Sequence, residues 1–341
     1  MASDAILEVE NVRKWFPVRA SLIGDMTRWA KRRLGREVGE ERWVKAVDDV
    51  SFSVERGGAI AIAGESGCGK TTLARTLLRL VEPTGGAVYY NGENIFDMNR
   101  LELSELRLQM QLIFQNPFEV LDPRHTVKDL VGEGLTIHRL VESDEVLHDK
   151  IMGALEDVRL IPAEDFATRY THELSGGQLQ RIAIARSLIL EPRLIIADEP
   201  VSMLDASIRT EVMNLMTDLQ QRKSLTYIFI THDLAQARYI GNYLIIMYLG
   251  RIAEMGPMED IIQNPQHPYT KALVSNIPIP DPTIERERIM LEGETPTPID
   301  LPPGCRFKPR CQEFGVHCKP EEPQLHEVAP GHWVACYFPD M

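Results

Sequence analysis

The run GESGCGKT, Gly64 to Thr71, has the composition and spacing of a loop that binds phosphate groups. Glycines let the backbone point its amides at phosphate oxygens, and Lys70 places a positive charge on them. Thr71 offers a hydroxyl to Mg²⁺, and Thr72 is expected beside an α-phosphate. A chance glycine-rich turn is disfavoured, because a strand is expected before the run and a helix after it. The candidate nucleotide ligands here are Gly64, Ser66, Gly67, Cys68, Gly69, Lys70, Thr71 and Thr72.

A second run, LIIADEP from Leu194 to Pro200, is an apolar strand that ends in two carboxylates. A buried strand can deliver Asp198 to the metal ion and Glu199 to an attacking water, so Glu199 is the candidate general base. The alternative is an acidic residue that caps a helix or faces solvent. The preceding phosphate loop favours the catalytic interpretation.

Between these two runs lies LSGGQ, Leu174 to Gln178. Two consecutive glycines let main chain approach phosphate, Ser175 adds a hydroxyl, and the helix expected next has N-terminal amides that favour anions. Ser175, Gly176, Gly177 and Gln178 are therefore candidate nucleotide contacts.

The elements that must position these residues alternate along the chain. Strands are expected at residues 5–16, 47–54, 59–63, 194–198, 227–231 and 243–249. Helices are expected at residues 180–190 and 206–222, and from about 104 to 175 the pattern is mostly helical. This order predicts an α/β core of parallel crossover units with a helical subdomain. Residues 276–304 contain seven prolines, which predicts an irregular wrap or linker.

Composition narrows the functional classes. The chain has 341 residues and a net charge of −13, which disfavours binding to nucleic acid over most of its surface. The N-terminal residues lack the features of a secretory signal, so we expect an intracellular protein. No apolar run approaches the roughly 20 residues that cross a bilayer.

Residues 21–34 form a basic amphipathic helix on paper. Contact with lipid headgroups or a membrane partner, and packing on the chain's own domain, are equally good interpretations of this insert.

Four of the five cysteines gather in the last tenth of the chain, with the spacing C-x5-C-x6-C-x17-C. In a reducing compartment such clustering favours metal over disulfides. An iron–sulfur cluster and structural zinc both accept four thiolates, and spacing does not choose between them. The candidate ligands are Cys305, Cys311, Cys318 and Cys336.

The ordered set of motifs, extended by IFQNPF and ITHD, resembles that of ATP-binding-cassette ATPases over about residues 5–260. The resemblance implies that Gln115 touches Mg²⁺ and a transmembrane partner, Asp205 joins two halves, and His232 contacts the γ-phosphate. It also implies that Phe16 stacks on adenine, although Trp15 is an alternative. Taken singly, Gln115 is better explained as a loop amide and His232 as a core histidine, but their order and spacing relative to the stronger motifs favour the roles that the resemblance implies.

In that family LSGGQ of one subunit closes over nucleotide held by another subunit. The resemblance therefore implies that Ser175, Gly176 and Gly177 serve a partner's ATP. ATP joins the two halves, and hydrolysis releases them to drive alternating access in membrane subunits.

The C-terminal segments NPQHPYT, Asn264 to Thr270, and CRFKPRC, Cys305 to Cys311, resemble the oligopeptide/dipeptide importer branch. This implies an ATPase domain at 1–260, with its helical subdomain at about 104–175, and an extension at 261–341 whose four cysteines bind a [4Fe–4S] cluster. Zinc and unligated thiols remain the alternatives.

Residues 82–96 and 114–127 resemble the second ATPase of this branch more than the first. The implied partners are a paralogous ATPase, two transmembrane permease subunits and a solute-binding protein, at the cytoplasmic face of the membrane. Peptide is the expected cargo, with oligosaccharide or nickel as alternatives. A soluble non-transport ATPase that acts on nucleic acid or ribosomes is an alternative that the single cassette and the net negative charge disfavour, and a redox-sensing ATPase is a further alternative.

Overall fold

The computed structural model describes residues 5–18, 42–277, 288–293, 295–299, 301, 303–315 and 318–337. The amphipathic insert expected at residues 21–34 lies outside the described residues.

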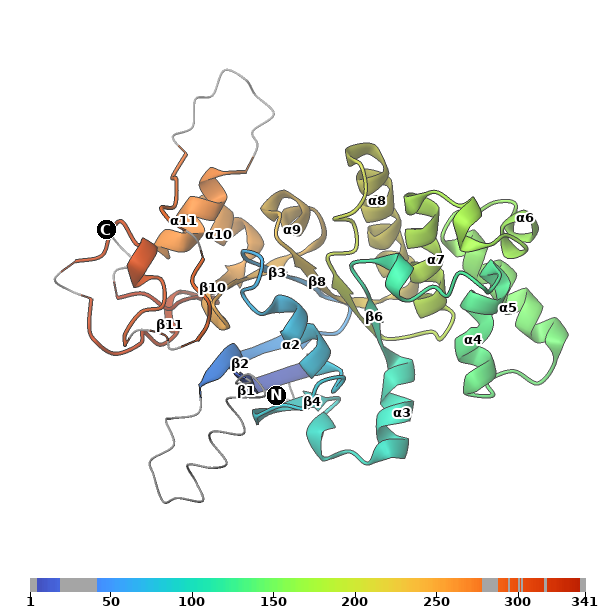
Figure 1. Cartoon of the computed structure of the whole chain (residues 1–341), viewed down its shortest axis with the longest axis horizontal. Coiled ribbons are helices and arrows are strands. Elements are labelled where there is room, and N and C mark those ends of the chain that lie inside the picture. Colours follow the sequence, from blue (N-terminus) through green and yellow to red (C-terminus); the bar gives the residue numbers. More distant parts are fainter. Residues whose placement is uncertain are drawn as a thin grey trace, which may run out of the picture.

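A mixed sheet of eight strands runs through the molecule in the order β11-β12-β10-β9-β3-β8-β7-β6 (Figure 1). Strands β6, β7, β8, β3 and β9 are parallel, whereas β10, β12 and β11 are antiparallel. Strands β3, β7 and β8 are buried along their whole length, as expected for parallel strands covered on both faces. The bounds are β3 Ala59–Ala63, β6 Met110–Ile113, β7 Leu194–Asp198, β8 Thr226–Thr231, β9 Tyr243–Tyr248, β10 Arg251–Pro257, β11 His326–Ala329 and β12 His332–Val334.

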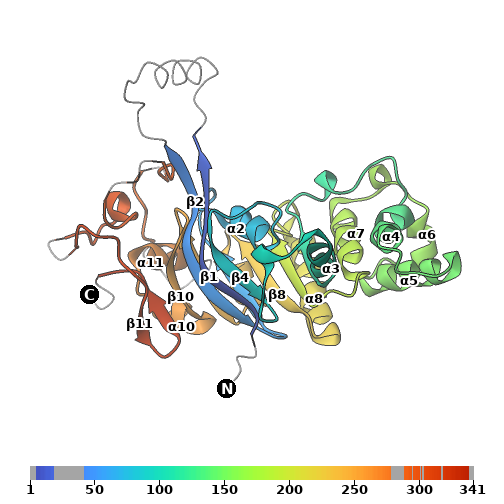
Figure 2. The same cartoon turned by 90° about the horizontal axis from the view of Figure 1, so that it is seen from below.

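A smaller antiparallel sheet, β2-β1-β4-β5, lies beside the first (Figure 2). It contains β1 Ala5–Pro17, β2 Trp43–Glu55, β4 Gly85–Tyr90 and β5 Glu93–Asn94. Helix α2, Lys70–Leu77, contributes Leu73 and Leu77 to a core cluster that also contains side chains of both sheets, such as Val50 and Ile230. The helix that begins in the phosphate loop is therefore held between two sheets.

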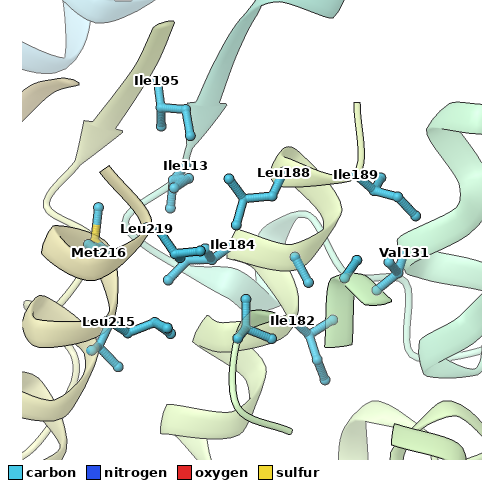
Figure 3. Packing of buried hydrophobic residues seen from close by; sticks show 14 of the residues in the cluster. Ile113, Val131, Ile182, Ile184, Leu188, Ile189, Ile195, Leu215, Met216 and Leu219 are labelled. Atoms are coloured by element: carbon cyan, nitrogen blue, oxygen red, sulfur yellow. The ribbon is translucent and has the colours of Figure 1, made fainter. Parts of the chain in front are cut away.

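The helical part is built from α4 Val127–Ile137, α5 Asp144–Asp157, α6 Ala163–Ala167 and α7 Gly176–Leu188. It forms one end of the long axis of the molecule (Figure 1). Helix α7 joins it to the core, because Ile184 and Leu188 pack with Leu219 of α8, Ala206–Lys223, and with Ile195 of β7 (Figure 3). The other helices of the described residues are α3 Arg100–Gln109, α9 Leu234–Ile240, α10 Met258–Gln263 and α11 Pro268–Ser275. The same part of the chain contains the 3₁₀ turns η1 Ile95–Asp97, η2 Pro117–Glu119, η3 Thr171–Glu173 and η4 Lys308–Arg310.

One strand lies where the sequence predicted helix. β6, Met110–Ile113, follows α3 directly and pairs in parallel with β7 at the edge of the large sheet. Its four residues are too few to show strand periodicity beside a longer helical pattern, which explains the error. In the part of the chain that the structure describes, no helix combines the length and apolar character needed to cross a membrane.

The C-terminal hairpin of β11 and β12 extends the large sheet, since Glu254 and Met255 of β10 pair with Val334 and Trp333. The Glu254 carboxylate is fully buried and accepts hydrogen bonds from the backbone amides of Gln266 and His267, at 2.8 and 2.9 Å. His332 of β12 lies 2.7 Å away through its Nε2 atom. Strand β10 is thus tied to both α11 and the hairpin through one carboxylate.

His267 caps helix α11, where its Nδ1 atom accepts a hydrogen bond from the Tyr269 amide at 3.0 Å. Burial lowers the pKa of His267 from 6.5 to about 4, although the charge of Glu254 acts in the opposite direction. Between these two pH values the unfolded chain binds a proton that the folded chain does not. The free energy of unfolding therefore falls as the pH drops, by on the order of 3 kcal/mol from this residue.

The variant His267→Asn keeps a side chain that can cap the helix but cannot be protonated in this range. We expect its free energy of unfolding, measured with denaturant, to fall less than that of wild type between pH 7 and pH 4. His326→Asn changes an exposed histidine of β11 and should behave as wild type. Equal pH dependence of H267N and wild type would contradict a neutral, buried His267.

Candidate nucleotide site

The phosphate loop connects β3 to α2, and its backbone lies against other backbone. A Cβ atom on Gly64 would come within 2.3 Å of the Met247 carbonyl oxygen, and one on Gly69 within 2.0 Å of the Ala46 carbonyl oxygen. Gly67 has φ 79°, in the left-handed region. Only glycine fits these positions, so the loop is held in place by contacts that tolerate no side chain.

Lys70 lies at the start of α2 and is buried. Its Nζ atom donates hydrogen bonds to the carbonyl oxygens of Gly64 and Glu65, at 2.7 and 3.0 Å. The ammonium group is therefore held inside the loop, where a phosphate would lie. Cys68 also belongs to the loop, but its thiol is buried in the core and burial raises its pKa. Only its backbone amide can serve a nucleotide.

Thr71 at the N-terminal end of α2 lies beside Asp198 at the carboxyl end of β7, and the threonine hydroxyl donates to the carboxylate at 3.2 Å. Asp198 is 5% exposed, and burial raises its pKa, with a further contribution from the charge of Glu199. A buried carboxyl with a raised pKa is stabilised in its charged form by a cation. These two oxygen ligands fit Mg²⁺, which prefers carboxylate and hydroxyl oxygens.

The next residue, Glu199, has φ 48°, a strained conformation for a residue other than glycine. Its amide donates to the Ile230 carbonyl at 2.9 Å, which fixes the turn at the end of β7. Gln115 Nε2 donates to Oε2 of Glu199 at 3.1 Å, and His232 Nδ1 lies 3.0 Å from the same oxygen. Strands β6, β7 and β8 each end next to one of these three residues, so the parallel sheet brings them together.

A cavity of about 740 Å³ is lined by nine of the predicted ligand and catalytic residues. Glu65 also lines the cavity, although it was not among the predicted ligands. Leu273 and Pro298 line it from the C-terminal part of the chain. The walls comprise Val44, Ala46, Glu65, Ser66, Gly67, Gly69, Lys70, Thr71, Thr72, Gln115, Glu199, His232, Leu273 and Pro298. The two C-terminal residues had no signal in the sequence beyond the proline-rich wrap to which Pro298 belongs.

Ser175 to Gln178 lie apart from this cavity, at the N-terminus of α7. The Ser175 hydroxyl accepts from the Gln178 amide at 3.4 Å, and the Gln178 side chain accepts from the Ser175 amide at 3.0 Å. Gln178 therefore caps its own helix. A Cβ on Gly177 would come within 2.4 Å of Ile208, whereas Ser175 and Gly176 are exposed. The helix end is open to a ligand brought from outside.

Asp205 and Phe16 are exposed on the surface near these elements. The Asp205 carboxylate caps α8 by accepting from the Ile208 amide at 3.1 Å, and this bond lowers its pKa. The Phe16 ring is 37% exposed and faces Lys14, whose Nζ is 4.7 Å from its centre. Trp15 is already engaged, because its indole donates to Asp48 at 3.0 Å. Lys45 also lies over the Trp15 ring, 4.8 Å from its centre, and Phe16 is the more exposed of the two aromatic residues.

All four C-terminal cysteines are described, and none forms a disulfide. In the described part of the chain, no three His, Cys, Asp or Glu side chains form a group that could hold a metal ion. Burial raises the pKa of Cys311 to about 11, and the nearby Cys305 and Cys336 also raise it. The described residues thus form no metal-holding group that corresponds to the predicted [4Fe–4S] cluster or to its zinc alternative.

Two family models match the chain, "ABC transporter" at residues 47–202 and "Oligopeptide/dipeptide transporter, C-terminal region" at residues 253–318. The oligopeptide transport ATP-binding protein AppF of Bacillus subtilis (strain 168) is 44% identical, over 98% of both chains. The dipeptide transport ATP-binding protein DppF of Haemophilus influenzae is 42% identical, over 98% of this chain and 97% of its own.

Solved structures of ATP-binding cassettes are also similar. The dimeric cassette MJ0796 bound to ADP and Pi superposes with a TM-score of 0.61 and 28% identity, over 74% of this chain and 98% of its own. The fold is thus that of an ABC ATPase cassette, and the likeness to AppF and DppF extends through the C-terminal region. The chain belongs to the ABC transporter family of ATPases, in its oligopeptide/dipeptide transport branch.

Proposed function

We propose that this chain is the ATP-hydrolysing subunit that energises import of peptides through a membrane transporter. One observation carries the catalytic part. The Glu199 carboxylate is held by Gln115 and His232 in the same cavity as Lys70 and Thr71, and beside Asp198. A base, a phosphate ligand and an oxygen site for a metal therefore lie where an ATP-hydrolysing centre needs them.

In this proposal Lys70 transfers its hydrogen bonds from the Gly64 and Glu65 carbonyls to the β- and γ-phosphates of ATP. Thr71, Asp198 and the amide oxygen of Gln115 would hold Mg²⁺, which neutralises phosphate charge. Glu199 accepts the proton of the attacking water, and His232 contacts the γ-phosphate. Positioning and charge stabilisation supply most of the catalysis in such reactions.

We further propose that the working unit is a heterodimer with a paralogous ATPase. The support is that Ser175 and Gly176 are exposed and lie apart from the chain's own phosphate loop. Asp205 is also exposed, at the N-terminus of α8. In this arrangement α7 completes the partner's ATP site and the partner completes this one, with Phe16 stacking on adenine.

Membrane subunits are proposed to bind in the groove between the helical subdomain and the sheet edge at β6. This groove has a volume of about 390 Å³ and is lined by Phe114, Glu133, Ile137 and Arg186, among others. Ile137 lines this groove and is 67% exposed, so it offers an apolar side chain to a protein that binds there. The chain would then lie at the cytoplasmic face of the membrane as a peripheral subunit, next to two permeases that receive solute from a binding protein.

We infer peptide as the cargo from the names of the similar oligopeptide and dipeptide transport proteins. Oligosaccharide and nickel importers are the alternatives, and no residue of the nucleotide cavity distinguishes them. Stimulation of ATPase activity in the reconstituted transporter by peptide, oligosaccharide or nickel identifies the cargo.

The division at residue 260, with its helical subdomain at about 104–175, and the [4Fe–4S] cluster at the four cysteines remain predictions. Iron and sulfide analysis after anaerobic purification tests the cluster.

Glu199→Gln removes the proposed base but keeps the size of the side chain. We expect unchanged ATP binding and a fall in turnover of about 10²- to 10⁴-fold at the site that this chain's phosphate loop forms. Glu191→Gln changes an exposed surface acid and should leave turnover unaltered. Wild-type turnover in E199Q would refute the role of Glu199 as base.

Ile137→Asp places a charge in the proposed docking groove. We expect loss of co-purification with the membrane subunits and no change in nucleotide binding, because a buried charge without a partner weakens an interface. Ile161 is 68% exposed but does not line the groove, so Ile161→Asp is the matched control. Assembly of I137D and I161D to the same extent would exclude the groove as the docking site.

A further inference from the structure

Glu65 is an acidic residue inside a loop that binds phosphate, and it lines the nucleotide cavity. A carboxylate at this place repels a polyanion unless its charge is compensated. The main compensating groups come from the C-terminal extension, and the charge of Lys70 in the cassette adds a smaller contribution. Arg310 donates two hydrogen bonds to the two carboxylate oxygens of Glu65, at 2.7 and 3.1 Å. This is the planar, two-bonded geometry that arginine forms with carboxylates.

Two further residues of the extension converge on the same glutamate. The Thr295 hydroxyl donates to Glu65 Oε2, and the Tyr269 hydroxyl accepts from the Glu65 amide at 2.8 Å. Burial raises the pKa of Glu65, but the Arg310 hydrogen bond and charge outweigh it, so the net pKa is lowered. Glu65 is therefore ionised, and the extension holds its side chain and its backbone from one side.

Arg310 is itself firmly held. Arg310 is only 8% exposed, and it belongs to the 3₁₀ turn η4. Four positions earlier, Arg306 donates to Asp48, to Glu322 and to the Leu249 carbonyl. Phe307 between them packs against Tyr248 and Tyr269, with ring centres 5.2 and 5.5 Å apart. The turn is thus fixed to β9 and α11.

On its other side Glu65 is connected to the catalytic lysine, because its carbonyl oxygen accepts a hydrogen bond from Lys70. A second arm of the extension reaches the mouth of the cavity. The Lys45 amide donates to the Pro298 carbonyl at 3.0 Å, and the Pro298 and Leu273 side chains line the wall. The extension therefore contacts both the loop that binds phosphate and the open end of the cavity.

We propose that the C-terminal extension is part of the nucleotide site, in which Arg310 is a positioning residue that neutralises Glu65 and holds the phosphate loop in its binding shape. The inference rests on the proposed ATP-binding function. Arg310 acts on the nucleotide through Glu65 and does not touch the reacting atoms. Loss of Arg310 leaves an unpaired carboxylate next to the phosphates, so the main effect is on ATP affinity and the smaller one on turnover.

The experiment measures the Kd of the full chain for a fluorescent ATP analogue with Mg²⁺, and the KM and kcat of the assembled transporter. Arg310→Met should weaken binding and raise KM by roughly tenfold, with kcat changed less. The double variant R310M/E65Q removes the carboxylate as well and should recover most of the affinity. Arg310→Lys should be intermediate, since lysine supplies the charge without the second hydrogen bond. Lys308→Met alters the same turn at a side chain that faces Phe314 and should match wild type.

Thermal unfolding without nucleotide identifies variants that have lost their fold. Tyr269→Phe removes the hydroxyl that accepts from the Glu65 amide, so it tests a second contact between the extension and the phosphate loop, and it should weaken binding several-fold even if R310M does not fold. Wild-type affinity in each of R310M and Y269F that folds would overturn the proposal. An R310M/E65Q protein that binds no better than folded R310M would overturn it too. Failure of the wild-type chain to bind ATP would instead refute the proposed function itself.

Discussion

The phosphate loop lies directly against the backbone of two other segments, and this close approach sets the rest of the site. Gly64 meets the Met247 carbonyl of β9, and Gly69 meets the Ala46 carbonyl of β2. The loop therefore cannot move away from either sheet without losing the packing of α2 between them. Because β7 and β8 are in parallel register beside β3, Asp198, Glu199 and His232 reach the same edge of the sheet as the loop. The geometry of catalysis follows from the register of a buried sheet.

Local signals were enough to predict the central part of this arrangement. Strands β3 and β7 coincide with the expected strands at 59–63 and 194–198, because each is a continuous apolar run that ends at a glycine or an acid. Strand β6 was missed, since four residues after a helix carry too little pattern. The contact of Arg310 with Glu65 joins residues 245 positions apart. No periodicity in the sequence signals a pair of that kind.

Three carboxylates near the phosphate loop, those of Asp48, Glu65 and Asp198, differ in whether an arginine of the chain pairs with them. Asp48 has its charge met within the chain by Arg306, and Glu65 by Arg310. Asp198 differs, because its buried carboxyl has a raised pKa and its hydrogen-bond partner Thr71 is neutral. Buried charges without partners are unfavourable. Of these three carboxyls, Asp198 is the one that forms no ion pair with an arginine, and it is the one expected to meet the metal ion.

Strand β10 pairs with β9 on one side and with β12 of the C-terminal hairpin on the other, so it connects the cassette to the extension. The family model for the C-terminal region begins at residue 253, inside this strand, and the strand's outer edge is covered by β12. A chain cut at residue 260 would keep Glu254 but lose His332 and the two amides of residues 266 and 267 that solvate its carboxylate. It would also expose an unpaired strand edge, which promotes aggregation. For protein engineering, we therefore expect the smallest stable form of this chain to extend through the hairpin, with a fusion or affinity tag placed after it.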